Sequence, residues 1–239
     1  MCSLSEEVSV YVTNDDVTQL QRVLTSKNIN MTVNDRRATL LMWAVGLRKY
    51  NVVEFLLSRG ASLYPRDIFY YNVFHHAAWH ADARIMKLLL YSAGVLSNDD
   101  WQHVMSISRA DRPSFRPGAR ALLDLPHPRN GRTPLMFAAL KGNVELVDFL
   151  ITEAGADVSL KDYSGNSVMD IAAQAGHKEV VMLLLARCSD DHGVHFDKTR
   201  RNAEENCYNA ATLQQLNTYN EIKTLLCQEW LSQSTVSFL

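Results

Sequence analysis

Three histidines stand within nine residues of the sequence, in the stretch NVFHHAAWH at 72–80. His76 and His80 are four residues apart, so on a helix they would lie one turn apart on the same face. The zinc motif HExxH uses this spacing to present two imidazoles to one ion. The stretch lacks the general-base glutamate of that motif, because position 77 is Ala. Two imidazoles also lack the third and fourth ligands that zinc requires, so we predict no metal here.

A second group of metal-ligand types occurs in the stretch DDHGVHFD at 190–197, which holds Asp190, Asp191, His192, His195 and Asp197. Carboxylates and imidazoles at this density can bind a divalent ion. Without a fixed scaffold, such a stretch is more often a solvated polar loop. A metal-dependent enzyme or metal-binding sensor that uses the His76/His80 pair or the 190–197 loop remains the alternative hypothesis.

Composition and charge narrow the function classes. The 239 residues are 47% hydrophobic and 21% charged, which is typical of a folded soluble protein. A net charge of −2 gives no general attraction to nucleic acid or to an anionic membrane. No apolar run approaches the roughly 18–20 residues that span a bilayer, and the N-terminus MCSLSEEVSVYV has no basic residue, unlike a signal peptide. The four cysteines form no CxxC pair, which favours free thiols in a reducing compartment. We therefore expect a cytoplasmic protein that neither binds nucleic acid nor inserts into a membrane.

The histidine stretch belongs to a repeated unit of about 33 residues. The segments 130–162 and 164–190 align with each other, and 37–63 and 71–94 share their layout. Each unit predicts a first helix with small residues, a short polar turn, and a second helix with apolar residues at helical spacing. Glycines such as Gly60 and Gly155 follow the second helices, where a left-handed residue ends a helix.

These units resemble the ankyrin repeat, whose pattern is DxxGxTPLHxAAxxGHxEVVxLLLxxGAD. In 131–157 the matching residues are Gly131, Thr133, Pro134, Leu135, Ala138, Ala139, Gly142, Glu145, Val147, Leu150, Gly155, Ala156 and Asp157. In 162–185 they are Asp162, Gly165, Ala172, Ala173, Gly176, His177, Glu179, Val180, Val181 and Leu183 to Leu185. The resemblance implies an all-α ankyrin-repeat solenoid of stacked helix-turn-helix units with β-hairpin loops.

The period predicts six to seven repeats, one of them degenerate, in a single domain over residues 1–239. We expect an N-terminal capping repeat at 1–33, repeats at 34–66 and 67–99, a degenerate repeat at 100–127, repeats at 128–161 and 162–189, an insertion loop at 190–201, and a C-terminal capping repeat and tail at 202–239. Arg37 replaces the turn glycine of the pattern, and Leu40 and Val73 replace its proline. We therefore expect these hairpins to be looser or differently shaped.

The resemblance also assigns the opening histidines. His75 takes the place of the usual histidine of the family, which implies that it helps to tie neighbouring repeats together. His76, Trp79 and His80 fall at variable positions of the first helix, which are expected to face solvent on the concave side. Partners of the family bind the hairpin tips and these exposed faces. The predicted partner-binding residues are Ile68, Phe69, Tyr71, Trp79, His80, Arg36, Leu47, Arg132, Lys141 and Tyr163.

The residue types at these positions indicate the kind of partner. Several exposed aromatic residues on one repeat would form an apolar patch of the kind that marks partner sites; alternatively, the neighbouring repeat or the loop at 109–117 covers them. Arg36, Arg132 and Lys141 would give the groove a basic edge suited to an acidic or phosphorylated segment. Solvated charges of no consequence are the alternative interpretation.

Enzyme motifs do not occur in the sequence. It contains no phosphate-binding glycine loop, no GxSxG and no HExxH, and an open groove makes it difficult to exclude water. We predict a non-enzymatic protein–protein interaction module without catalytic residues or cofactors. It would act as an adaptor or scaffold, or as a structural subunit of a multi-subunit complex. The terminal Ser237-Phe238-Leu239 could be a PDZ-domain ligand, a possibility that the sequence leaves open.

Overall fold

The computed structural model describes residues 4–80, 83–93, 122–188 and 213–236. These residues contain eleven helices and no strand, apart from an isolated bridge between Thr32 and Thr39. The helices are α1 (Leu4–Thr13), α2 (Val17–Val23), α3 (Leu40–Gly46), α4 (Tyr50–Ser58), α5 (Val73–His80), α6 (Ala83–Ser92), α7 (Pro134–Leu140), α8 (Val144–Thr152), α9 (Val168–Ala175), α10 (Lys178–Cys188) and α12 (Leu213–Val236). Within the described ranges, no helix combines the length and apolar character needed to cross a bilayer. The predicted all-α class is confirmed.

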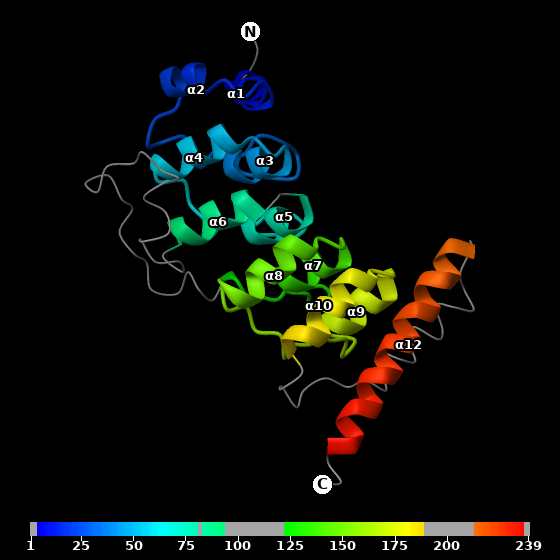
Figure 1. Ribbon diagram of the computed structural model, residues 1–239. Coiled ribbons are helices and arrows are strands. Elements are labelled where there is room, and N and C mark those ends of the chain that lie inside the picture. The colour runs from blue at the N-terminus through cyan, green and yellow to red at the C-terminus, as the bar shows by residue number, and fades with distance from the viewer. Residues whose placement is uncertain (1–3, 81–82, 94–121, 189–212, 237–239) are drawn as a thin grey trace. The chain divides into compact units, whose positions relative to one another are not determined.

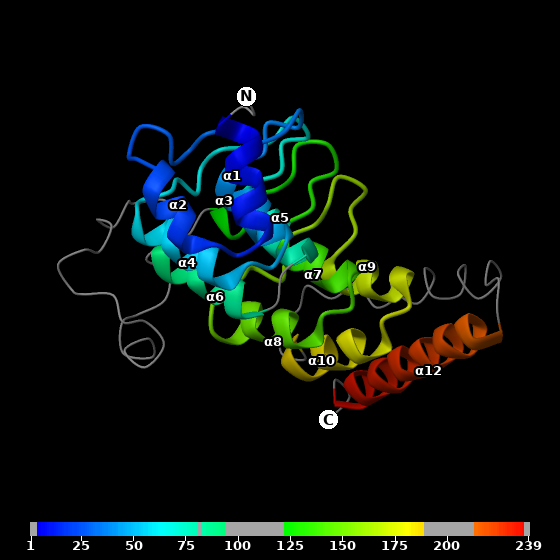
Figure 2. The same ribbon diagram turned by 90° about the horizontal axis from the view of Figure 1, so that it is seen from above.

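The chain divides into two compact units, residues 1–128 and 129–239. In the first unit, three helix pairs stack so that α1, α3 and α5 form one layer and α2, α4 and α6 form a second (Figures 1 and 2). The predicted second helix of the N-terminal repeat, at 16–24, is α2. The division into repeats within a single domain, as set out from the period, remains a prediction.

Apolar side chains fill the space between the two layers of the first unit. Leu41, Phe74 and Leu89 are fully or almost fully buried, as are the small Ala44 and Ala77. Burying one large apolar side chain contributes about 1.5–3 kcal/mol. The alanines have no bulk beyond Cβ, so they let neighbouring helices approach closely at the positions that the repeat pattern predicted.

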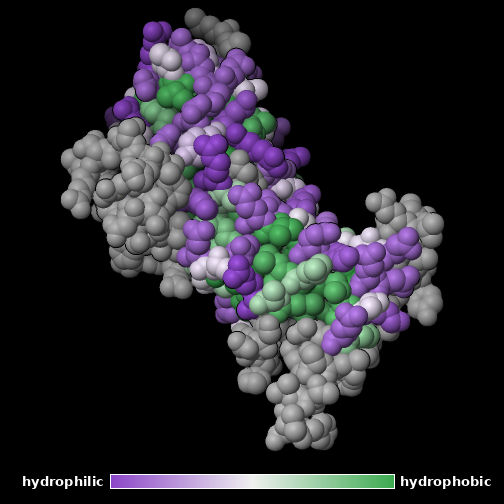
Figure 3. Space-filling view, viewed as in Figure 1, coloured by the Kyte–Doolittle hydropathy of each residue, from purple (hydrophilic) through white to green (hydrophobic). Residues whose placement is uncertain are grey.

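The second unit repeats this arrangement. Helix α7 packs on α9, α8 packs on α10, and α12 covers α10 (Figure 1). His177 Nε2 lies 3.0 Å from the carbonyl oxygen of Leu140 and joins the two helix pairs. A Cβ at Gly142 would lie only 2.5 Å from the His177 ring, so this turn requires glycine. Apolar side chains gather on the face of this unit shown in Figure 3. Val144 and Met182 are exposed large apolar residues of this unit.

Side-chain caps begin the first helices. Thr39 and Thr133 accept the backbone N–H of Met42 and Met136, and Ser167 accepts that of Asp170. Ser167 and Asp170 form a complete capping box, in which the Ser167 N–H donates to Asp170 Oδ2 at 2.8 Å. These caps satisfy N–H groups that have no partner within the helix.

The hairpin loops before α3, α5 and α9 share one turn. Asn34, Asp67 and Asp162 each accept backbone N–H groups two and four residues further on, at 2.8–3.1 Å. Arg37 (φ 55°) and Tyr70 (φ 68°) adopt the left-handed conformation that Gly165 (φ 72°) adopts in the third loop. The expectation that the loops without glycine would be looser or differently shaped was therefore wrong for these loops, because the Asn or Asp side chain holds the turn.

Ser167→Ala removes the hydroxyl of the capping box. We expect the free energy of unfolding to fall by about 1 kcal/mol, because the Asp170 N–H loses its acceptor in a buried position. Urea titration followed by circular dichroism measures this loss. Thr152→Ala is the matched control, since its hydroxyl bonds only the exposed carbonyl of Asp148 one turn back in α8. An equal loss in both variants would contradict the capping role.

Arg37→Gly tests the strain in the first hairpin. A left-handed conformation costs a non-glycine residue about 1–2 kcal/mol, and glycine costs about 0.5–1 kcal/mol more than another residue to order. We expect a gain in stability of several tenths of a kcal/mol, measured by urea titration. Gly165→Ala should do the reverse and destabilise the chain, because it introduces a Cβ at φ 72°. A loss of stability in Arg37→Gly would show that the arginine is not strained there.

Candidate functional site: a groove between α3 and α5

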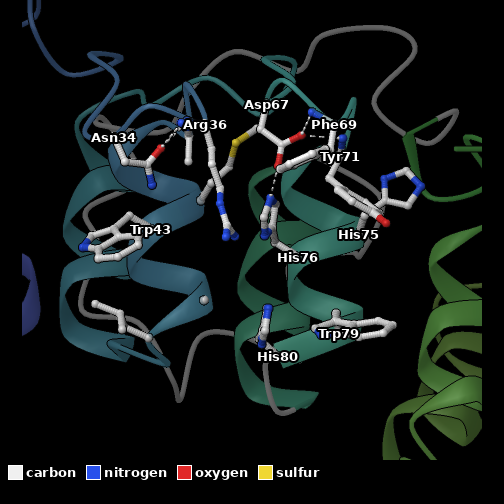
Figure 4. A pocket seen from close by; sticks show the side chains of 14 residues that line it. Asn34, Arg36, Trp43, Asp67, Phe69, Tyr71, His75, His76, Trp79 and His80 are labelled. Carbon is white, nitrogen blue, oxygen red and sulfur yellow. Dashed lines mark hydrogen bonds and ion pairs between the residues drawn. The ribbon is translucent and has the colours of Figure 1, made fainter. Parts of the chain in front are cut away.

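A groove of about 520 Å³ lies in the first unit, between α3 and α5 and next to their hairpin loops (Figure 4). Its volume falls in the range of small-molecule sites, which is about 300–1,000 Å³. The lining residues are Asn34, Arg36, Ala38, Met42, Trp43, Gly46 and Leu47 from α3 and its loop, and Asp67, Phe69, Tyr71, His75, His76, Trp79 and His80 from α5 and its loop.

Helical spacing brings the lining side chains to the groove. Trp43 and Leu47 are one turn apart at the end of α3, and His76 and His80 are one turn apart on α5, so each pair shares a face. The ring centroids of His76 and His80 are 6.4 Å apart with nearly parallel planes. Arg48, which follows α3, donates from Nε to the carbonyl oxygen of His80 and joins the ends of the two helices.

A buried carboxylate lies where the second hairpin meets α5. Asp67 is only 6% exposed, and its Oδ1 accepts the N–H groups of Phe69 and Tyr71. Its Oδ2 lies 3.1 Å from His76 Nε2. Burial by itself would raise the pKa of Asp67, but the hydrogen bonds from His76, Tyr71 and Phe69 and the charge of His76 outweigh burial and lower it. His76 lines the groove, as its position in the repeat predicted, but its ring is only partly exposed and is hydrogen-bonded to Asp67.

Aromatic rings support the same hairpin from behind. Tyr71 stacks on His127 with ring centroids 4.3 Å apart. His127 is buried, and its Nε2 lies 2.7 Å from the carbonyl oxygen of Phe69. The ring of His75, which was expected to tie repeats together, lies 5.9 Å from the ring of His127. The backbone N–H of His75 donates to Asn72 Oδ1, so the Asn72 side chain caps the start of α5. These contacts fix the loop that carries Phe69 and Tyr71.

Arg36 extends from the first hairpin into the groove (Figure 4). Its guanidinium carbon lies 5.8 Å from the centroid of the Phe69 ring, within the range of a cation–π contact. The backbone joins the same two hairpins, because the Ile68 N–H donates to the Arg36 carbonyl oxygen at 2.9 Å. The second unit contains the equivalent bond, from the Tyr163 N–H to the Asn130 oxygen.

The predicted partner-binding residues fall into three places. The residues that line the groove are Phe69, Tyr71, Trp79, His80, Arg36 and Leu47. Ile68 lines a smaller hollow of about 390 Å³ on the hairpin edge, together with Arg37, Arg66, Asp67 and Tyr70. Arg132, Lys141 and Tyr163 lie in the second unit. Their roles in binding stay predictions.

The three second-unit residues differ in how their side chains are engaged. Arg132 Nε lies 3.6 Å from Asp162 Oδ2, so its charge is offset within the chain. Tyr163 is 66% exposed, and its ring lies over Gly131, where a Cβ would meet it at 2.5 Å. Lys141 is exposed at the C-terminal end of α7. The basic edge formed by Arg36, Arg132 and Lys141 stays a prediction.

Sequence reasoning missed Trp43 and Asp67 as groove residues. Trp43 stands four residues before Leu47, so the helical period of α3 could have placed both on one face. No spacing signal links Asp67 to His76, because the hydrogen bond depends on how the hairpin folds back on α5. His127 lies 58 residues after Phe69, and only the fold brings the two together.

The two candidate metal sites have different outcomes. Among the described residues, no three or more His, Cys, Asp or Glu side chains come together as a metal ion would require. The His76 ring is hydrogen-bonded to Asp67 instead. The loop at 190–197 lies outside the described residues, as do the segment at 109–117 and the terminal Ser237–Leu239.

Comparison with known proteins identifies the family. A model described as ankyrin repeats (3 copies) matches residues 74–199, which is more than half of the chain, and a single ankyrin-repeat model matches 37–68. The chain belongs to the ankyrin-repeat family. The groove therefore lies between the first helices of two successive ankyrin repeats, with their hairpin loops at one end.

Several curated proteins share these repeats. The chicken nuclear factor NF-kappa-B p105 subunit is 28% identical over 200 residues, which cover 79% of this ankyrin-repeat chain and 20% of that protein. Mouse inversin is 44% identical over 59 residues, covering 25% of this chain and 6% of inversin. The E3 ubiquitin-protein ligase XBAT33 of Arabidopsis thaliana is 48% identical over 58 residues, covering 24% and 11%. The chain thus spans a fifth or less of each of these relatives.

Asp67→Asn removes the negative charge of the side chain but keeps an oxygen that can accept the hydrogen bonds of the turn. Asn34 shows that an amide oxygen can hold the same turn, so the variant loses only the negative charge that His76 contacts. A lowered pKa means that Asp67 contributes stability above the pKa of the unfolded chain and loses it as the pH falls through the folded value. At pH 7 we expect a loss of about 1 kcal/mol in the free energy of unfolding.

The pH dependence gives a second measurement for this variant. Denaturant titrations from pH 7 down to pH 3 should show wild-type stability falling in acid, and the fall should be smaller in Asp67→Asn. Asp35→Asn, at an exposed position in the neighbouring hairpin, is the control and should follow the wild type. Identical acid profiles for Asp67→Asn and the wild type would contradict the role of this carboxylate.

Proposed function

We propose that this ankyrin-repeat chain is a non-enzymatic protein–protein interaction module that holds a partner in the groove between α3 and α5. The observation that carries the proposal is the groove of about 520 Å³ lined by Trp43, Phe69, Tyr71 and Trp79. Trp79 is 39% exposed and lines the groove together with the other three aromatic residues, and a grouping of exposed apolar side chains is what marks a partner site. Tryptophan, tyrosine and arginine are also the residue types most enriched at binding hot spots.

The polar groups of the groove support binding rather than catalysis. Both oxygens of Asp67 are engaged, by two backbone N–H groups and by His76. A general acid or base must instead reach a proton of its substrate. The name of XBAT33 describes an E3 ubiquitin-protein ligase, but the similarity covers 24% of this chain and 11% of that ligase. We carry over the interaction role of the shared repeats and not the ligase activity.

The module would serve in the cytoplasm, either as an adaptor or as a structural subunit of a larger assembly. Its partner would be a protein, not nucleic acid or a membrane. An adaptor predicts a chain that is monomeric and stable alone, whereas a permanent subunit predicts a chain that associates or precipitates without its complex. Sedimentation of the purified chain separates these two roles.

The groove is tested by affinity capture from native lysate with wild-type protein and Trp79→Ala. We expect a specific partner to be retained by the wild type and to bind the variant about 30-fold more weakly, since truncating a hot-spot tryptophan costs about 2 kcal/mol or more. Tyr64→Ala is the matched control, because Tyr64 is 41% exposed in the same unit but does not line the groove.

The thermal stability of all three proteins is compared first, so that a loss of binding cannot be attributed to unfolding of a variant. Equal retention of the same partners by wild type and Trp79→Ala would place the binding surface elsewhere on the chain. Loss with Tyr64→Ala alone would point to the hairpin side of the first unit instead.

A further inference from the structure

We infer that the groove takes an extended segment of a partner protein in which an acidic side chain pairs with Arg36 and a nearby apolar side chain packs against Trp79. The inference rests on the proposed function and specifies the chemistry of the partner. It follows from the two charged residues of the groove, because the chain itself compensates the charge of Asp67 but not that of Arg36.

Asp67 and Arg36 are the two residues of fixed charge among those that line the groove. The carboxylate of Asp67 is buried, and the chain itself compensates it through two N–H donors and His76. Arg36 is exposed, and no carboxylate of the described residues lies within ion-pair distance of its guanidinium. Among the described residues, Arg36 is thus a positive charge in the groove without an ion-pair partner.

The position of Arg36 suits a ligand rather than bulk solvent. Its guanidinium lies over the Phe69 ring at 5.8 Å and points into the groove (Figure 4). A stacked guanidinium keeps its planar fork of N–H donors available, and that fork matches the two oxygens of a carboxylate. Arg132 in the second unit is the contrasting case, because its charge already has Asp162 as a partner at 3.6 Å.

Other positively charged residues lie near Arg36. Arg37 and Arg66 line the hollow on the hairpin edge, both exposed, and Asp35 is the only exposed acid of the two described hairpins at 34–38 and 66–71. Neighbouring charges of one sign add up to a potential that attracts the opposite sign before contact. An acidic segment is therefore the complement of this edge.

The apolar part of the groove sets the second requirement. Trp79 lies on α5, and Leu47 directly follows α3, with Trp43 one turn before it. A volume of about 520 Å³ admits more than one side chain. We favour a carboxylate over a phosphate because one guanidinium reaches the groove, whereas phosphorylated motifs are recognised by clusters of arginines.

The test uses a phage library of random 12-residue peptides panned on the immobilised full chain. Peptides that bind the wild type but not Trp79→Ala are sequenced and synthesised, and their Kd is measured by fluorescence anisotropy. We expect them to carry Asp or Glu within a few residues of an aromatic or large aliphatic side chain. Arg36→Gln should weaken their binding about tenfold, a change of about 1.4 kcal/mol.

Arg59→Gln is the matched control. Arg59 is exposed in the same unit, and its guanidinium lies 5.7 Å from the Phe55 ring, but it does not line the groove. The two variants therefore remove the same charge and the same kind of ring contact. Binding by Arg59→Gln should match the wild type, and equal weakening in both would mean that only the net charge of the chain matters.

A double-mutant cycle assigns the contact. Replacing the acidic peptide residue with its amide should weaken binding to the wild type about tenfold and should have little further effect on Arg36→Gln, because paired groups are not additive. Fully additive losses, or equal binding to wild type and Arg36→Gln, would overturn the inference. A phosphoserine version that binds tenfold more tightly would overturn the choice of a carboxylate.

Failure of this inference is distinct from failure of the proposed function. If Trp79→Ala weakens peptide binding but Arg36→Gln does not, the groove is still the binding site, but the partner needs no acidic side chain. The absence of any Trp79-dependent peptide overturns the inference, while the proposed function is decided by the lysate capture, which depends on Trp79 and not on Arg36.

Discussion

The helix pair of an ankyrin repeat has apolar sides that the pair itself cannot cover. This constraint makes the stack necessary, because an apolar face left in water loses the free energy that burial supplies. Alanines such as Ala44 and Ala77 lie fully buried where first helices meet, so the backbones approach closely enough to exclude water. The groove exists because only the buried sides of α3 and α5 face the second helices, which leaves their other sides open.

The hairpin loops add a second level of order to the stack. The N–H of Ile68 bonds the oxygen of Arg36, so the position of one loop depends on the next. Asp67 shapes its own loop and also contacts His76 on the helix that follows. A groove residue such as Phe69 is thereby held by its loop, by the neighbouring loop and by His127 behind it. Preorganised loops of this kind lose less entropy when a partner binds.

The sequence predicted the helices well because their signal is periodic and local. A spacing of 33 or 34 residues fixed the register, and apolar residues at helical spacing marked α8 and α10. The same register predicted that Arg36, Leu47, Phe69 and Trp79 lie at hairpin tips or exposed first-helix positions, and all four line the groove. Family resemblance supplied the remaining step, which was the side of the repeat that faces outward.

Contacts between side chains that share no period were beyond the sequence. The hydrogen bond between Asp67 and His76 needs the rotamer of each residue, and the contact between His127 and Phe69 closes a loop of 58 residues. The same limit explains the error about the hairpins. The lack of glycine at position 37 suggests a change in the shape of the loop. Asn34, three positions earlier, nevertheless supplies the hydrogen bonds that keep the usual turn.

That turn has a consequence for how the surface can vary. Where glycine sets the conformation, the tip of the loop has no side chain, and shape and surface chemistry are decided by the same residue. Here Asn34 and Asp67 set the conformation, while Arg37 and Tyr70 occupy the tip and line the hollow beside it. Loop conformation and surface chemistry therefore depend on different positions. Substitutions at the tip can change what the loop recognises without changing its backbone conformation.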